Sequence, residues 1–231
     1  MFHFKRFSIK QDRCALKVGT DGVVLGAWTN VEGVKRVLDI GTGTGLLALM
    51  IAQRNSEAQI DAIEIDDASA EQAAENVTAS PWADRIRVHR MDVRRIRSAE
   101  PYDLIICNPP FYAGEMRSAD ERAGVAKHSG ELSFVELGQV VSDHLSDQGR
   151  FACIIPINRE KELIGTLVPF SIHPSRRCEL KYLEDRPAKR LLLEFARDRK
   201  EVRPEVLVVE NAPGEFTLQY RYLLKDFLLK F

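Results

Sequence analysis

Cysteine is scarce in this sequence, and its few cysteines are far apart. The 231 residues contain four, Cys14, Cys107, Cys153 and Cys178, and no two of them have the close spacing that a zinc site uses. Cys107 and Cys153 lie in apolar runs, where a free thiol behaves as a small hydrophobic side chain. The histidines show no metal-ligand spacing either. We therefore expect four reduced thiols and no metal site.

Long apolar runs and a strong net charge are also missing. No apolar stretch approaches the roughly 18 residues of a membrane span, and residues 1–6 lack the apolar region of a signal peptide. These absences predict a cytoplasmic protein that does not enter a membrane. The net charge is −1 and the pI is about 6.5, unlike the bulk basic charge of many nucleic-acid-binding proteins. Any contact with an anionic partner would therefore depend on local clusters of positive charge.

The sequence does contain a regular alternation of short apolar strands and helices. Strands are expected at 36–40, 59–64, 86–91, 102–107 and 150–156, and helices at 45–53, 67–77, 133–145 and 159–167. Such alternation indicates a parallel sheet with helices on both faces. Further strand-like runs follow at 178–183, 190–196 and 206–209, with a helix near 216–229. We predict a single α/β domain over residues 1–231, with an antiparallel C-terminal strand and residues 1–30 as a short N-terminal extension.

The first of these strands runs into a glycine-rich turn that contains Gly41, Gly43 and Gly45. Glycine lets the backbone turn sharply and come close to a ligand. Only one residue separates the second and third glycines, whereas the dinucleotide fingerprint has two. Asp39 precedes the turn, and Glu64 ends the next strand, where a carboxylate can accept hydrogen bonds from both hydroxyls of a ribose. This set suits S-adenosylmethionine, which has no phosphate and whose amino group needs an acceptor such as Asp39 or its neighbours.

Asp92 follows the third strand, at the height where the adenine amino group of such a cofactor would lie. An aspartate in that place is more often a simple turn residue. An ordinary tight turn with solvated acids is likewise the alternative for the glycines taken alone. The glycines and three acids together favour a cofactor site.

The most specific motif follows the fourth strand: Asn108, Pro109, Pro110 and Phe111, with Tyr112 next. Two consecutive prolines fix φ and remove two backbone donors, which leaves a stiff turn with outward carbonyls. The Asn108 side-chain carbonyl and the Pro109 backbone carbonyl can then accept both N–H bonds of one planar amino group. Phe111 offers a face on which a base can stack.

A nitrogen conjugated with a ring is a poor nucleophile, because its lone pair is delocalised. Two fixed acceptors disfavour its planarity, aim the lone pair at a sulfonium methyl group and stabilise the developing charge. No general base is needed before transfer. The alternative is a plain Pro-Pro turn, which the glycine-loop frame disfavours. The residues therefore predict methylation of a planar nitrogen, such as the exocyclic amino group of an adenine in RNA.

Together, these motifs resemble the Rossmann-like class I methyltransferases that act on amino groups. Two narrower runs, Asp12–Trp28 and Glu75–Ile86, resemble the bacterial tRNA(Val) (adenine-N6)-methyltransferase family, as does the tail Leu223–Phe231. The resemblance covers essentially the whole chain. It implies transfer of a methyl group from S-adenosylmethionine to N6 of adenine 37, in the anticodon loop of a valine tRNA.

The resemblance also implies a role for each motif residue. It places Gly41, Gly43 and Gly45 at the amino-acid end of the cofactor with Asp39 nearby, Glu64 at the ribose and Asp92 at the adenine amino group. Thr20, Asp21 and Gly22 would close over the methionine end, and Asn108, Pro109, Pro110 and Phe111 would hold the target adenine. Phe111 departs from the family pattern, because close relatives often carry Tyr at this position. The choice between adenine and guanine as the target base is therefore more open.

Positive charge gathers at 5–17, 85–97 and 176–190. Phosphate contacts supply much of the affinity for RNA. The candidate tRNA contacts are Arg13, Lys17, Tyr112, Lys127 and His128, the last three within a polar stretch, 112–132, that we expect to order on substrate contact. Solvated faces balanced by the 34 acidic residues are the alternative for each cluster.

Three other functions stay open. Guanine-N2 methylation of rRNA uses the same Asn-Pro-Pro-Phe motif. Methylation of a glutamine amide on a release factor uses the same chemistry but predicts an N-terminal helical domain, for which the chain before Val37 is too short. A non-catalytic RNA-binding protein would have an eroded glycine loop or tetrapeptide, and both are intact. We expect a monomer, since class I enzymes of this size can be monomers.

Overall fold

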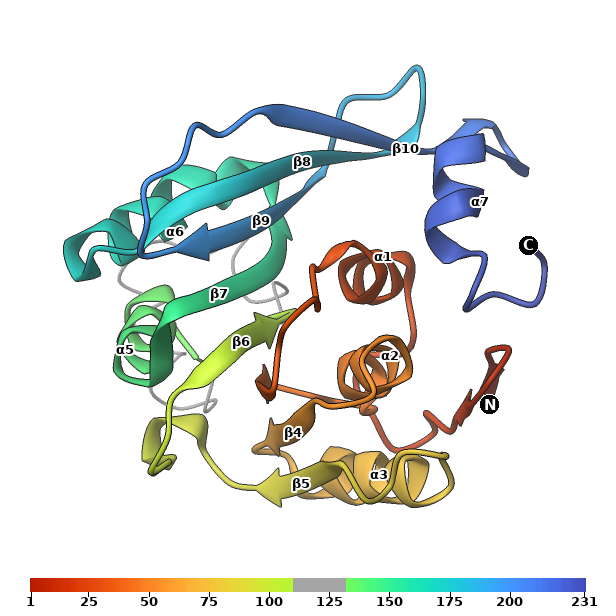
Figure 1. The fold of residues 1–231 in the computed structure, drawn as a ribbon. Coiled ribbons are helices and arrows are strands. Elements are labelled where there is room, and N and C mark those ends of the chain that lie inside the picture. The colour runs from red at the N-terminus through yellow and green to blue at the C-terminus, as the bar shows by residue number, and fades with distance from the viewer. Residues whose placement is uncertain (110–131) are drawn as a thin grey trace.

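The computed structural model describes residues 1–109 and 132–231, and these form a layered α/β structure (Figure 1). Its centre is a nine-stranded sheet in the order β11-β10-β8-β9-β7-β6-β3-β4-β5. Five of these strands are parallel neighbours: β3 (Arg36–Ile40), β4 (Gln59–Glu64), β5 (Ile86–Arg90), β6 (Tyr102–Cys107) and β7 (Leu145–Pro156). The chain starts in the middle at β3, runs outward to β5 and then returns to β6. This reversal makes a topological switch point between β3 and β6, where ligands of such sheets bind.

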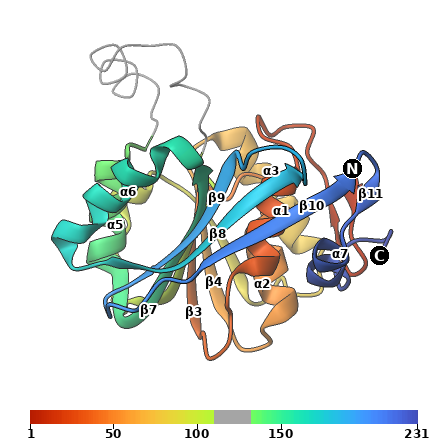
Figure 2. The ribbon, with the colours of Figure 1, turned by 90° about the horizontal axis from the view of Figure 1, so that it is seen from above.

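The C-terminal strands extend the sheet beyond β7 and depart in part from the expectation. They are β8 (His173–Leu183), β9 (Arg190–Ala196), β10 (Pro204–Ala212) and β11 (Glu215–Phe216). β9 inserts between β7 and β8 and is antiparallel to both. β10 then lies parallel to β8, as the two long strands of Figure 2 show. The predicted antiparallel strand is therefore β9, and the short β11 is a second one.

Helices cover both faces of the sheet, as predicted. One face carries α1 (Thr20–Trp28), α2 (Leu46–Arg54), α3 (Asp67–Thr78) and α7 (Leu218–Leu224), and the other carries α5 (Phe134–His144) and α6 (Glu160–Leu167) (Figures 1 and 2). Short 3-10 turns cover Val93–Arg95, Ile157–Arg159 and Val168–Phe170. Each face has its own buried apolar cluster. The α/β class and the order of its elements thus agree with the sequence pattern.

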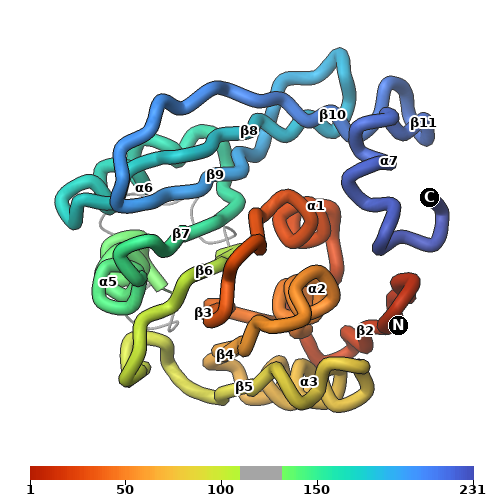
Figure 3. Tube along the Cα trace, in the orientation of Figure 1, coloured from red at the N-terminus to blue at the C-terminus, as the bar shows by residue number. Residues whose placement is uncertain are grey.

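The C-terminal helix is shorter than predicted. α7 ends at Leu224, because the following residues pair with the N-terminal hairpin of β1 (Phe2–His3) and β2 (Ser8–Ile9). Phe4 and Leu228 form a β-bridge, and the amide of Lys5 donates to the Phe227 carbonyl over 2.8 Å. The Lys5 ammonium also donates to the carbonyls of Lys225 and Phe231. The first and last residues therefore lie side by side (Figure 3).

α1 and α2 pack closely, because glycine replaces a side chain at two places in α1. A Cβ added at Gly26 would meet the Met50 Sδ at 2.7 Å and its Cβ at 3.2 Å. One at Gly22 would meet the Leu46 Cδ2 at 2.9 Å and the Asn108 Nδ2 at 3.6 Å. The close approach brings the first turn of α1 beside Asn108.

Replacing Gly26 with Ala should therefore destabilise the fold by about 1–3 kcal/mol, because the buried Met50 must shift to make room. The matched control is Gly165→Ala in α6, where a Cβ would meet nothing within 4 Å. That change should be neutral or stabilise by about 0.5–1 kcal/mol, since alanine loses less entropy in a helix. Urea titration of the two variants measures both effects. Equal midpoints would contradict the packing argument.

Candidate active site

The glycine loop follows β3 in a backbone conformation that other residues rarely adopt. Gly41, Gly43 and Gly45 have φ values of +68°, +56° and +82°. A Cβ at Gly41 or Gly43 would meet nothing within 4 Å, whereas one at Gly45 would contact Ala73 of α3 at 3.7 Å. The first two glycines therefore leave their backbone open to a ligand, and the third begins α2.

Glu64, at the end of β4, supports this loop. Its Oε2 accepts from the Gly43 amide at 2.9 Å, and its Oε1 accepts from the amides of Ile65 at 2.9 Å and Asp66 at 3.0 Å. The side chain is only 9% exposed, yet it lines a cavity of about 710 Å³. A carboxylate has about four acceptor positions, so Glu64 can still accept from a ligand while it holds the loop.

Asp39 lies beneath the loop and is fully buried. Its Oδ2 accepts from the Thr42 hydroxyl at 2.6 Å, and its Oδ1 has no hydrogen-bond partner among the described residues. Burial raises the pKa of this carboxyl to about 7. Thr42 lines a second cavity, of about 490 Å³, but Asp39 is not among the described residues that line either one. Asp39 is therefore connected to the 490 Å³ cavity by its hydrogen bond with the Thr42 hydroxyl.

Asp92, in the turn after β5, lines the 710 Å³ cavity together with Glu64. Its carboxylate accepts from the Arg94 guanidinium at 2.6–2.9 Å, which lowers the pKa of Asp92. Arg94 also donates to Glu136 at 2.8 Å. Glu136 belongs to the capping box that Ser133 forms at the start of α5. Asp92 is thus ionised and held in place from two elements.

Asn108 and Pro109 lie where the two cavities adjoin, because both residues line both of them, as do Gly41, Gly43 and Leu16. The 490 Å³ cavity also brings together Lys17, Thr20, Asp21 and Gly22. The sequence motifs of β3, β6 and α1 therefore meet at one place, the carboxyl edge of the sheet. Pro110, Phe111, Tyr112, Lys127 and His128 lie outside the described residues.

Several residues of this region have no individual signal in the sequence. Tyr182 of β8 and Arg190 of β9 line the 490 Å³ cavity. The Tyr182 hydroxyl donates to Asp21, and the Arg190 Nε donates to Asp21 at 2.9 Å. Asn76, which is buried, donates to the Thr44 carbonyl at 2.9 Å and to the Lys10 carbonyl at 2.8 Å. Asn76 thus joins the glycine loop to the N-terminal segment. This gives a structural role to one residue of the Glu75–Ile86 run.

Many of the clustered cations have structural partners. Arg13 lines the 710 Å³ cavity but pairs with Glu75 at 2.5 Å and with Glu71 at 3.4 Å. Arg85 donates to the carbonyls of Ala52, Asn55 and Ala58. Arg6 lies over the ring of Trp82 at 5.6 Å. A count of basic residues therefore overstates the charge available to an anionic partner.

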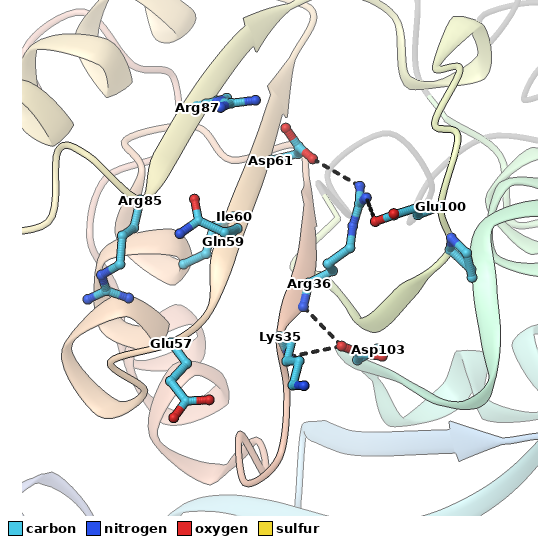
Figure 4. Close-up of a pocket in the computed structure, with 11 residues that line it drawn as sticks. Lys35, Arg36, Glu57, Gln59, Ile60, Asp61, Arg85, Arg87, Glu100 and Asp103 are labelled. Carbon is cyan, nitrogen blue, oxygen red and sulfur yellow. Dashed lines mark hydrogen bonds and ion pairs between the residues drawn. The ribbon is translucent and has the colours of Figure 1, made fainter.

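A third cavity, of about 730 Å³, lies at the opposite, amino-terminal edge of β3, β4 and β6. Figure 4 shows that charged side chains line it and pair with one another. Arg36 lies 3.8 Å from Asp61 and 2.7 Å from Glu100, while Asp103 accepts from the amides of Lys35 and Arg36. Ligands of parallel sheets bind at the carboxyl ends of the strands. We therefore assign the candidate site to the glycine-loop edge.

No group of three or more His, Cys, Asp and Glu side chains in residues 1–109 and 132–231 could hold a metal ion. Among the same residues, no helix has the length and apolar character needed to cross a membrane.

The raised pKa of Asp39 predicts an unusual pH dependence of stability. Between pH 4 and 7 the folded protein holds this proton and the unfolded chain releases it, so the contribution of Asp39 to stability falls as pH rises. Asp39→Asn removes the effect. Relative to wild type, the variant should gain on the order of 2 kcal/mol in unfolding free energy between pH 5 and pH 8.

Denaturant titration at the two pH values measures this change. Asp66→Asn is the control, because hydrogen bonds from Ser69 lower the pKa of Asp66. The contribution of Asp66 is complete above its unfolded pKa, so its substitution should have the same effect at pH 5 and 8. A pH-independent difference between wild type and Asp39→Asn would show that Asp39 is not protonated in the fold.

Comparison with known proteins agrees with this arrangement. The "Methyltransferase small domain" family matches residues 23–136, from α1 to the start of α5. A tRNA1(Val) (adenine(37)-N6)-methyltransferase from Flavobacterium psychrophilum is 41% identical over 233 residues, which cover all of both chains. One from Trichodesmium erythraeum is 40% identical and covers all of this chain and 98% of its own.

A solved structure agrees in fold at much lower identity. It is a predicted O-methyltransferase from Agrobacterium tumefaciens, which is 19% identical with a TM-score of 0.67, and the match covers 90% of this chain and 96% of the other. This likeness concerns the fold alone. The two full-length relatives decide the narrower question, and the chain belongs to the family of tRNA1(Val) (adenine(37)-N6)-methyltransferases.

Proposed function

We propose that this protein transfers a methyl group from S-adenosylmethionine to N6 of adenine 37 in the anticodon loop of tRNA(Val). The observation that carries the proposal is the place of Asn108 and Pro109 at the junction of two cavities, beside the open glycine loop. The name of the full-length relatives supports the base and the tRNA.

The residues at the loop fit such a cofactor. Glu64 has one of about four acceptor positions left, on Oε2, for a ribose hydroxyl. Asp92 is ionised and lines the same cavity, so it can accept from the adenine amino group. The open backbone of Gly41 and Gly43 leaves room for the amino-acid end. The first turn of α1, with no side-chain cap at Gly19, has amides that can donate to a carboxylate. When bound, S-adenosylmethionine supplies an electrophilic methyl group on a sulfonium.

Asn108 and Pro109 then act on the acceptor. The Asn108 side-chain carbonyl and the Pro109 backbone carbonyl accept the two N–H bonds of the adenine amino group. This weakens conjugation of the nitrogen with the ring and directs its lone pair out of the plane. The nitrogen gains the methyl group and a positive charge, and one of its protons leaves to water afterwards. Pro110 and Phe111, which follow directly in the chain, are proposed to stiffen this turn and to stack on the base.

Replacing Asn108 with Ala should reduce kcat by about 100-fold or more, because one of two fixed acceptors is lost. The cofactor dissociation constant should stay within about threefold, since the ribose and adenine contacts lie elsewhere. The control is Asn211→Ala on β10, an exposed residue outside the three described cavities. It should leave both constants unchanged.

The assay is nucleoside mass spectrometry on unmodified tRNA incubated with S-adenosylmethionine and each protein. N6-methyladenosine at position 37 of tRNA(Val), absent with the Asn108 variant, is the expected result. Formation of N2-methylguanosine in rRNA, or of methylglutamine in a release factor, would overturn the substrate assignment and leave the methyl-transfer chemistry in place.

A further inference from the structure

The described residues give the two adjoining cavities charges of opposite sign. Those that line the 710 Å³ cavity include four carboxylates, Asp12, Glu64, Asp66 and Asp92, and one arginine. Those that line the 490 Å³ cavity include two cations, Lys17 and Arg190, and the carboxylate of Asp21. An acidic cavity suits a cofactor with a sulfonium, an ammonium and ribose hydroxyls. A cavity with an excess of cations suits a ligand that brings an anion.

Arg190 is held firmly at the edge of this second cavity. It is the first residue of β9 and pairs in register with Pro156 of β7 and Leu180 of β8. Its Nε donates to Asp21, whose other oxygen accepts from the Tyr182 hydroxyl. The Arg190 side chain is nevertheless 28% exposed. Its Nη1 also donates to the Lys189 carbonyl at 3.4 Å. A guanidinium has five N–H donors in a fixed geometry, so one that a carboxylate orients in this way is positioned to bind an oxyanion as well.

The neighbours of Arg190 relate it to the acceptor. Asn108 and Pro109, which we propose hold the target base, line the same cavity. Asp21 is followed directly by Gly22, where an added Cβ would lie 3.6 Å from the Asn108 Nδ2. A nucleotide bound at Asn108 brings its own phosphates, and arginine is suited to bidentate contact with phosphate. Lys17, just before α1, adds a second cation on the same cavity.

We propose that Arg190, oriented by Asp21 and Tyr182, binds a backbone phosphate of the RNA next to the methylated nucleotide. The inference rests on the proposed function and goes further, because it assigns a phosphate-binding residue to the wall of the acceptor cavity. Arg190 is thereby a substrate-binding residue, and Asp21 is a positioning residue that acts through it. The other anion that could reach this cavity is the carboxylate of the cofactor, which the experiment below distinguishes.

The test compares Arg190→Gln with wild type in two binding measurements. A fluorescent anticodon stem-loop RNA is titrated with protein saturated with S-adenosylhomocysteine at several salt concentrations, and S-adenosylhomocysteine binding is measured separately by calorimetry. Arg190→Gln should weaken RNA binding about tenfold at low salt and lower the slope of log affinity against log salt by about 0.7, the loss of one phosphate contact. The cofactor constant should stay within about twofold.

Two further variants control for charge and fold. Arg177→Gln removes an arginine of similar exposure, 22%, that also lies among acids but lines none of the described cavities. It should not change the slope. Arg190→Lys keeps the charge and loses the fork of donors, so it should restore the slope but only part of the affinity. If Arg190 had only a structural role, Arg190→Lys would not restore the salt slope of RNA binding while leaving the RNA affinity reduced.

Each contrary result has a distinct meaning. Loss of cofactor affinity in Arg190→Gln with an unchanged salt slope would assign the anion to the cofactor and overturn the inference. An unchanged slope and unchanged affinities would overturn it as well. In both cases, N6-methyladenosine formed by the wild-type protein would leave the proposed function intact. Failure of the wild-type protein to methylate any RNA would overturn the proposed function and this inference together.

Discussion

The three hydrogen bonds that Glu64 accepts from two neighbouring turns hold the site together. Its carboxylate binds the Gly43 amide of the loop after β3 and the Ile65 and Asp66 amides of the turn after β4. Its three glycines have positive φ values that only glycine adopts readily, so these positions have no side chains with which to fix the loop. A neighbouring strand must therefore supply the support. Because the same carboxylate lines the 710 Å³ cavity, support of the loop and the proposed recognition of the cofactor depend on one group.

A second layer of support comes from buried polar side chains beneath and behind the loop. Asp39 accepts from Thr42, and Asn76 binds the Thr44 carbonyl from α3. Burying such groups costs free energy unless they are paired. The side-chain amide and carbonyl of Asn76 both have hydrogen-bond partners. One oxygen of Asp39 has no partner among the described residues, and burial raises the pKa of Asp39 to about 7. Local stability is therefore lower here than an apolar core would give, in exchange for a fixed loop conformation.

The sequence predicted the parts of this structure that depend on local pattern. The period of apolar residues placed β3 to β7 and their helices within a few residues. The described residues of the glycine and Asn-Pro-Pro motifs lie together at the carboxyl edge of the sheet. Contacts between distant segments were not predictable in this way. Nothing near Tyr182 or Arg190 indicates that they meet Asp21, and clustered arginines such as Arg85 gave no sign of their carbonyl partners. The sequence shows where positively charged residues cluster, but it does not show which carbonyls and carboxylates they bind in the fold.

The ion pair between Asp21 and Arg190 joins residues that are 169 positions apart. Bringing such distant parts together makes folding slow, because a large loss of chain entropy comes before the contact is gained. A ribosome adds roughly 5–20 residues per second. The glycine loop, Glu64 and Asn108 therefore leave the ribosome several seconds before Arg190 does. The described residues that line the acidic cavity are all made before β8 and β9, whereas the wall of the proposed acceptor cavity is complete only after those strands emerge.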